Sequence, residues 1–360
     1  MDCMQFDLPR RGGRWAPGAL AGLLALTVFA CGGDGDGDGG GAGGGGAAPL
    51  AISAGNAQPV AGAVVEITSD LVDVGGLTSD VGTLAVPTVT PSPALADFVG
   101  RQLLALLSTG PSTTINPLAV STETLPCDPP SGGGSAGTVT FTDNDADDSG
   151  TATVGDSVTV AFDNCFDSED GLTINGSLTI AIDELSGDDI EGGTDLTATV
   201  TATIDDLSFT DDGVRESVDG SMQLTLDIDG ATGTESLTLI IDELTATNDG
   251  TSDVVSDATL SVSTDSTGAS TVSVDATFTF AGLGGSVTVE TIVAFESVND
   301  EANPMAGEAL ITGADGSSVR LTAQPDGVNV VLAVDADGDG DAETEIDTTW
   351  AALDPDTVPG

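Results

Sequence analysis

The sequence contains no histidine, no lysine and no tyrosine among its 360 residues. Without His or Lys, the chain has no Ser–His nucleophile pair, no Schiff-base lysine and no His-based zinc site. A carboxylate pair of the glycosidase kind remains available. However, 59 acidic residues place neighbours such as Asp188 and Asp189 together by chance, so such pairs indicate no catalytic site. We therefore expect a protein that is not an enzyme.

Positive charge is nearly absent as well. Six Arg residues stand against 59 Asp and Glu, which gives a formal net charge of −53. Nucleic acid is excluded as a partner because no basic surface could displace its counterions. A field this negative is repelled by anionic membrane surfaces and attracts divalent cations. An acidic, solubilising surface accounts for most of the charge.

The first 30 residues have the pattern of a bacterial export signal. Arg10, Arg11 and Arg14 precede an apolar run from Ala19 to Ala30. That run is shorter than the ~20 residues that a membrane-spanning helix needs. It ends in Val28-Phe29-Ala30-Cys31, and a glycine-rich stretch follows.

This ending resembles the lipobox of bacterial lipoproteins, in which a small residue precedes the cysteine. The resemblance implies cleavage before Cys31, a diacylglyceryl thioether on its sulfur, and acylation of the new amine by a fatty acid such as palmitate. With Gly32 after the cysteine, it also implies sorting to the outer membrane of a Gram-negative envelope, on its periplasmic or surface face. The rest of the chain resembles uncharacterised β-rich envelope lipoproteins of proteobacteria, which assigns it no activity.

The mature chain divides into three parts by composition. Residues 31–49 form the lipidated cysteine and a flexible tether, since Gly32 to Gly46 contains eleven Gly, three Asp and one Ala. Residues 50–126 form a short helical or irregular segment, and residues 127–360 form a β domain. Within the middle part, Ala57 to Ile67 is weakly periodic and fits a short helix. A second helix is expected from Pro93 to Ser108, with an apolar stripe that we interpret as packing on a sheet.

From Gly137 onward, apolar and polar residues alternate with a period of two, which predicts half-buried strands. The clearest apolar sets are Leu172, Ile174, Leu178, Ile180, Ile182; Leu196, Val200, Ile204; Met222, Leu224, Leu226, Ile228; Val272, Val274, Ala276, Phe278, Phe280; and Val328, Val330, Leu332, Val334.

We therefore expect a mainly β protein, a long antiparallel meander that forms a sandwich or a half-open barrel. One or two short helices should pack near its N-terminal side. A transmembrane barrel is disfavoured, because such barrels carry aromatic girdles and this chain has no Tyr and two Trp.

Cys127 and Cys165 are the remaining thiols of the mature chain. An exported protein with two spare cysteines usually joins them. We expect a disulfide, because the pair lacks the CxxC spacing and the basic neighbours of a redox site.

An Asp-rich loop follows the last predicted strand, with acids at Asp335, Asp337, Asp339, Asp341 and Glu343. It resembles the start of an EF-hand or another calcium loop, with acids at alternate positions and Gly at the sixth. The twelfth position is Ile346 instead of Glu, which implies weak affinity. The alternative is a solvated hairpin tip. The stretch from Asp143 to Asp148 is a weaker version without the sixth-position Gly.

These features predict an envelope or cell-surface lipoprotein with a structural or interaction role, attached to the membrane through its lipid anchor. The alternative is a carrier that holds a lipid or another apolar ligand in a half-open barrel. Calcium is the one cofactor that the sequence suggests. No protein or lipid partner can be named from it.

Overall fold

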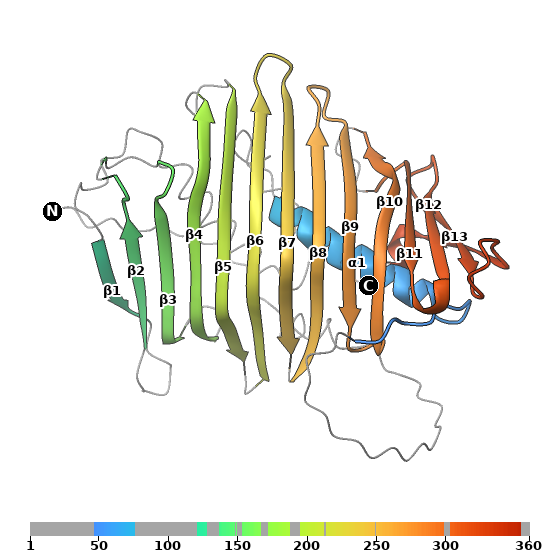
Figure 1. Cartoon of the computed structure of the whole chain (residues 1–360), viewed down its shortest axis with the longest axis horizontal. Coiled ribbons are helices and arrows are strands. Elements are labelled where there is room, and N and C mark those ends of the chain that lie inside the picture. Colours follow the sequence, from blue (N-terminus) through green and yellow to red (C-terminus); the bar gives the residue numbers. More distant parts are fainter. Residues whose placement is uncertain are drawn as a thin grey trace, which may run out of the picture.

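A computed structural model describes residues 47–75, 121–127, 137–147, 149, 153–166, 172–187, 195–211, 214–248, 250–298 and 303–353. The described chain forms a single 14-stranded sheet with α1 (Ala57–Gly75), a short α3 (Trp350–Leu353) and a 3-10 turn, η4 (Ala314–Gly316) (Figure 1). The predicted signal peptide, Cys31 and the predicted helix at 93–108 lie outside the described residues.

The strands follow one another along the chain with lengths from 6 to 16 residues. They are β1 (Ser121–Pro126), β2 (Thr138–Asn144), β3 (Ser157–Phe166), β4 (Thr173–Gly187), β5 (Leu196–Asp211), β6 (Val214–Asp229), β7 (Thr234–Asn248), β8 (Thr251–Thr264), β9 (Ser270–Phe280), β10 (Gly285–Ser297), β11 (Ala306–Thr312), β12 (Ser318–Ala323), β13 (Asn329–Asp335) and β14 (Thr344–Thr349).

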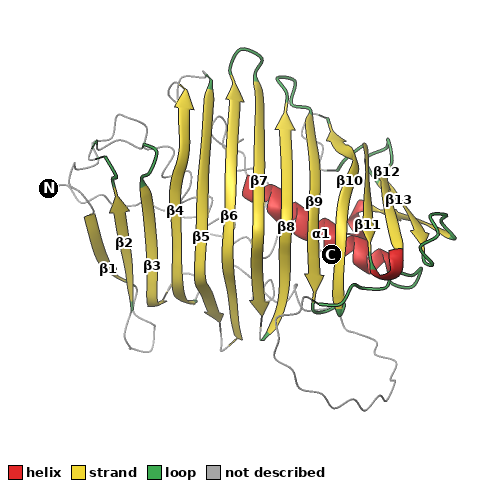
Figure 2. Ribbon diagram, viewed as in Figure 1, coloured by secondary structure: helices red, strands yellow, loops and turns green. Residues whose placement is uncertain are grey.

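Each strand pairs in antiparallel fashion with the strands before and after it, so the spatial order equals the chain order (Figure 2). The predicted mainly β meander is confirmed. It forms one open sheet with β1 and β14 at opposite ends. The sheet begins at Ser121, a few residues before the boundary at 127 that the sequence pattern indicated.

The alternating pattern places one set of apolar side chains on the covered face of the sheet. Leu178, Ile180 and Ile182 of β4 are 1–3% exposed, and Phe278 of β9 is fully buried. The prediction for Val328 was wrong, because this residue precedes β13 in a turn and is 53% exposed. The remaining residues of that set, Val330, Leu332 and Val334, are buried as predicted.

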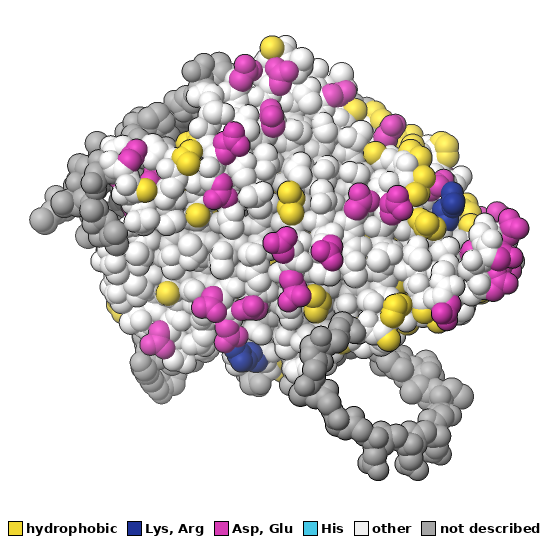
Figure 3. Space-filling model, viewed as in Figure 1, with side chains coloured by type: hydrophobic (Ala, Val, Ile, Leu, Met, Phe, Trp, Pro, Cys, Tyr) yellow, Lys and Arg dark blue, Asp and Glu magenta, His cyan; other side chains and the backbone are white. Residues whose placement is uncertain are grey.

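The opposite face is polar. In Figure 3 it is dominated by uncharged polar side chains and backbone, with acidic groups scattered over it. Hydroxyl pairs join neighbouring strands there, such as Thr159 with Thr179 at 2.9 Å and Thr199 with Thr225 at 3.2 Å. Cross-strand pairs of this kind contribute a few tenths of a kcal/mol each, up to ~1.

Helix α1 lies across the covered face of the sheet (Figure 1). Ala57 to Ile67, the segment expected to form a short helix, is its first part. Val60, Ala61, Val64 and Leu71 point into the core and are 0–6% exposed. The helix precedes the sheet in the sequence, yet its main contacts are with α3 and with strands from the middle of the meander onward, β7, β8, β12 and β13.

The segment before α1 is fixed to the same part of the sheet. Pro49 forms an isolated parallel bridge with Ser286 at the start of β10. Leu50 donates its N–H to the Ser286 carbonyl (2.8 Å) and accepts from the N–H of Ala314 (2.8 Å). The buried Ile52 donates its N–H to Ser317 Oγ (2.9 Å). These bonds bind the start of the described chain to β10 and to the η4 turn, and the Ile52–Ser317 bond joins residues 265 positions apart in the sequence.

Candidate metal-binding loops

The Asp-rich loop joins β13 to β14 and is shaped by its glycines. Gly338 has a φ of 75° and Gly340 a φ of 94°, in the left-handed region that side chains disfavour. A Cβ on Gly338 would also lie 2.5 Å from the carbonyl oxygen of Asp315. The loop therefore packs closely against η4, and only glycine fits at this point of contact.

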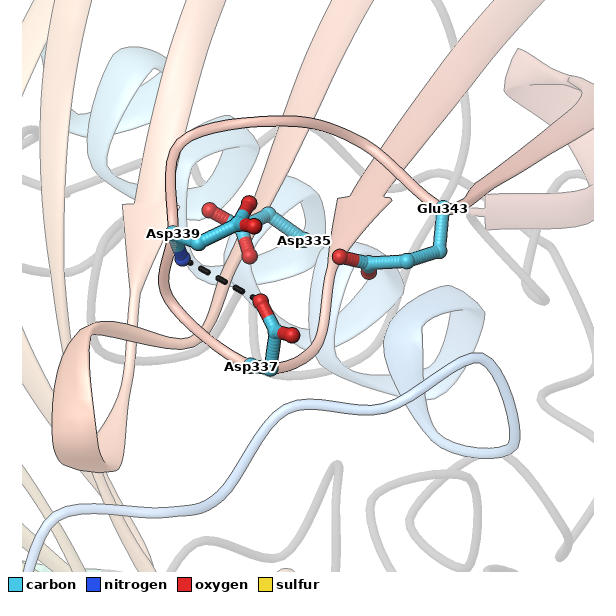
Figure 4. Close-up of side chains that lie close together, drawn as sticks. All are labelled: Asp335, Asp337, Asp339 and Glu343. Atoms are coloured by element: carbon cyan, nitrogen blue, oxygen red, sulfur yellow. Dashed lines mark hydrogen bonds between the residues drawn. The ribbon is translucent and has the colours of Figure 1, made fainter.

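Four of the five predicted acids come together in this loop. Carboxylate oxygens of Asp335, Asp337, Asp339 and Glu343 all lie within 4.8 Å of one another. Figure 4 shows the three aspartates around the inside of the loop, with Glu343 opposite them. Asp341 is not part of this group, although its N–H donates to Asp339 Oδ1 at 2.9 Å.

Backbone N–H groups hold two of these carboxylates in position. Asp335 is 8% exposed, and its two oxygens accept from Gly338 N (2.7 Å) and Gly340 N (2.8 Å). Glu343 Oε2 accepts from Ala336 N at 2.8 Å. A carboxylate oxygen has more than one lone pair, so these bonds leave capacity for a cation.

The neighbouring carboxylates change the pKa of Asp337. The N–H of Asp339 donates to its carboxylate (3.2 Å) and by itself lowers the pKa of Asp337. The negative charge of Asp339, then desolvation, then the charges of Glu343 and Asp335 outweigh this bond and raise the pKa above its ordinary value. The four carboxylates thus repel one another, and a hard cation with oxygen ligands would relieve that repulsion.

A second acidic group lies in the connection between β2 and β3. Oxygens of Asp145, Asp147 and Asp156 are also within 4.8 Å of one another. Asp156 is 8% exposed and accepts from Ala146 N (2.8 Å) and Thr153 N (2.7 Å). The Ser149 side chain makes the main hydrogen bond that lowers the pKa of Asp147.

The sequence pattern predicts this second loop only in part. It singled out residues 143–148 but missed Asp156, which returns to the loop because β2 and β3 form a hairpin. The available signal was Gly155-Asp156 immediately before an apolar strand. Asp143 lies in β2 outside the group, and burial, followed by the charges of Asp145 and Asp156, raises its pKa. Asp148 lies outside the described residues.

Cys127 and Cys165 are joined by a disulfide, with their Cα atoms 5.3 Å apart. The bond links the residue after β1 to β3, across β2. Cys127 also donates its N–H to the Gly137 carbonyl at 3.2 Å. The disulfide therefore crosslinks the strands at one edge of the sheet.

Comparison with known proteins identifies no relative. No protein family model, curated protein or solved structure matches this chain. In the part of the chain that the structure describes, no helix is long and apolar enough to cross a membrane.

Proposed function

We propose that the protein is a non-catalytic lipoprotein of the bacterial envelope, anchored through Cys31 and serving a structural or interaction role. The anchor rests on the basic, apolar and Val28-Phe29-Ala30-Cys31 elements of the sequence. A non-catalytic role is supported by the absence of His and Lys from the whole chain.

The packed covered face of the sheet is the observation that favours this role over that of an apolar carrier. Buried residues from Ile52 to Leu353 form one continuous hydrophobic cluster, and Phe278 is the largest of its fully buried side chains. A carrier needs an apolar cavity of several hundred Å³. A hollow of about 510 Å³ lies near the turn between β12 and β13, but Gln324, Asp326, Asn329 and Asp347 line much of it.

The anchor is tested by detergent phase partitioning of the full chain expressed in a Gram-negative host. The wild type should enter the detergent phase, and Cys31→Ser should remain aqueous. Equal partitioning of the two proteins would reject the anchor. Native mass spectrometry of the same preparation tests the alternative function, since a stoichiometric lipid other than the attached chains would support a carrier.

We further propose that the loop between β13 and β14 binds calcium weakly and stabilises the last hairpin. Its carboxylates supply oxygen ligands, as Ca²⁺ prefers, and Asp335 and Glu343 are already oriented by backbone bonds. The lack of a glutamate at position 346 removes a bidentate ligand, so we expect a dissociation constant of ~10⁻⁴–10⁻³ M, as in extracellular modules.

Thermal unfolding with and without millimolar calcium tests this second proposal. Calcium should raise the melting temperature beyond the effect of magnesium at equal ionic strength, and Asp337→Asn with Asp339→Asn should abolish that excess. Glu345→Gln with Asp347→Asn is the matched control, since it removes the same charge from the adjoining strand β14. If the calcium effect persists in the loop variant, or is absent from the wild type, the loop is not a calcium site and its acids are only solvated surface charge.

A further inference from the structure

The described chain starts at one particular end of the sheet. Residues 47–50 run parallel to the start of β10, through the bridge between Pro49 and Ser286. Ser286 donates its N–H to the Ala48 carbonyl (3.1 Å) and its Oγ to the Ala47 carbonyl (3.3 Å). Because β10 runs away from the turn that joins it to β9, the chain before Ala47 leaves toward that turn.

The turn between β9 and β10, residues 281–284, differs from the other strand connections. When the residue on either side is included, every other connection between successive strands contains at least one Asp or Glu. This one reads Phe-Ala-Gly-Leu-Gly-Gly and contains none. Ala281 is exposed and Leu283 is half-buried. The chain has a net charge of −53. Because this turn carries no charge of its own, a lipid surface repels it less than it repels the other strand connections.

We propose that this turn is the part of the domain that contacts the bilayer in which Cys31 is anchored. The inference rests on the proposed lipid anchor. Fifteen glycine-rich residues separate Cys31 from Ala47, and from this number and composition we expect a span of roughly 20 Å on average. The tether therefore keeps the turn close to the membrane surface, while the turns at the opposite strand ends lie a full strand length further away.

Acidic groups around this turn determine which lipids it can approach. Asp253 Oδ1 accepts from Ala281 N at 2.8 Å, so one carboxylate is directed toward the turn backbone. Asp315 of η4 and the loop from Asp335 to Glu343 lie at the same strand ends. Contact should therefore be closest on zwitterionic lipid and weaker on anionic lipid, where these charges are repelled.

The test places a tryptophan in the turn of the lipidated full chain. Leu283→Trp and Ser266→Trp, in the turn between β8 and β9 at the opposite strand ends, are reconstituted on phosphatidylcholine vesicles with brominated acyl chains. Trp350 is the only other tryptophan after Cys31 and is buried, so the parent protein gives the background. Bromine should quench the residue at 283 at least twofold more than the one at 266.

The outcomes separate the two proposals. Vesicle flotation with equal quenching at the two positions would overturn the contact while leaving the anchor intact. Loss of flotation would overturn the anchor and the contact together. If Leu283→Trp lowers the melting temperature strongly, the exposed Ala281→Trp in the same turn replaces it, and the same comparison with Ser266→Trp decides.

Discussion

The two edges of the open sheet are stabilised by different means. At the first edge, β1 and β3 are linked by the disulfide between Cys127 and Cys165. At the last edge, α3 follows β14 directly and packs on α1, and Trp350 lies edge-on to Phe295 with ring centroids 6.1 Å apart. Both edge strands have 6 residues, whereas β5 and β6 have 16.

The two edges are stabilised differently because α1 packs near one of them. Helix α1 crosses to β12 and β13, so it supplies apolar contacts to the last edge. Its main contacts with the sheet are with β7, β8, β12 and β13, whereas the first edge carries the disulfide crosslink. An open meander exposes two edges that can pair with other chains, and this chain stabilises one edge by packing and the other by a crosslink.

The largest effect, up to about 5 kcal/mol, is expected at the helix-covered edge. Leu353 is 1% exposed, and its carbonyl approaches α1 so closely that a Cβ on Gly62 would lie 2.7 Å from its oxygen. Leu353→Ala should lower the free energy of unfolding by about 2–5 kcal/mol, the range for a truncated core leucine. Chemical denaturation measures it, with Val154→Ala as an exposed control expected to change stability by less than ~0.5 kcal/mol. Equal effects would show that α3 is not part of the core.

The second effect is expected at the crosslinked edge. Cys127→Ser with Cys165→Ser should cost about 3–4 kcal/mol, from the entropy of a loop with a sequence separation of 38. Hydrogen exchange should show faster amide exchange in β1 to β3 and unchanged exchange in β12 to β14. Uniform loss of protection across the sheet would contradict separate stabilisation of the two edges.

The smallest effects are expected at two turns near the last edge, where the pKa values of Asp326 and Asp337 are shifted in opposite directions. Bonds from the N–H groups of Asn329 and Val328 lower the pKa of Asp326, so its stabilisation is present above the ordinary pKa near 3.8 and is lost as the pH falls through the lowered value. The pKa of Asp337 is raised, so its ionisation opposes folding once the pH rises above that range. Without calcium at pH 7, Asp326→Ala should lower the melting temperature and Asp337→Asn should raise it slightly. Shifts of the same sign would contradict this assignment.

The strands could be predicted because the period-two pattern reports burial directly. Leu178, Leu224 and Leu332 all occupy the covered face, as their alternation indicates. The arrangement as one open sheet could not be read in this way, since alternation is the same in a sandwich, a barrel and an open sheet. The strands on which α1 packs could not be predicted either, because contacts between residues hundreds of positions apart leave no local periodic signal.

The Asp-rich loop was predictable to a similar degree. Alternating acids and glycines located Asp335, Asp337, Asp339 and Glu343, since the tight turn keeps nearby residues close together. Asp341 follows the same alternation but lies outside the group, because loop geometry, and not spacing alone, sets where each carboxylate lies. Asp156 joins the other acidic loop only through hairpin pairing.

We propose above that the domain is attached to the membrane by acylation of Cys31. Mass spectrometry of the N-terminal peptide, taken from protein isolated from the envelope of a Gram-negative host, tests it most directly. We expect a mature chain that begins at Cys31 and carries a diacylglyceryl group and an N-acyl chain. An unmodified Cys31, or a mature chain that begins at any other residue, would contradict it.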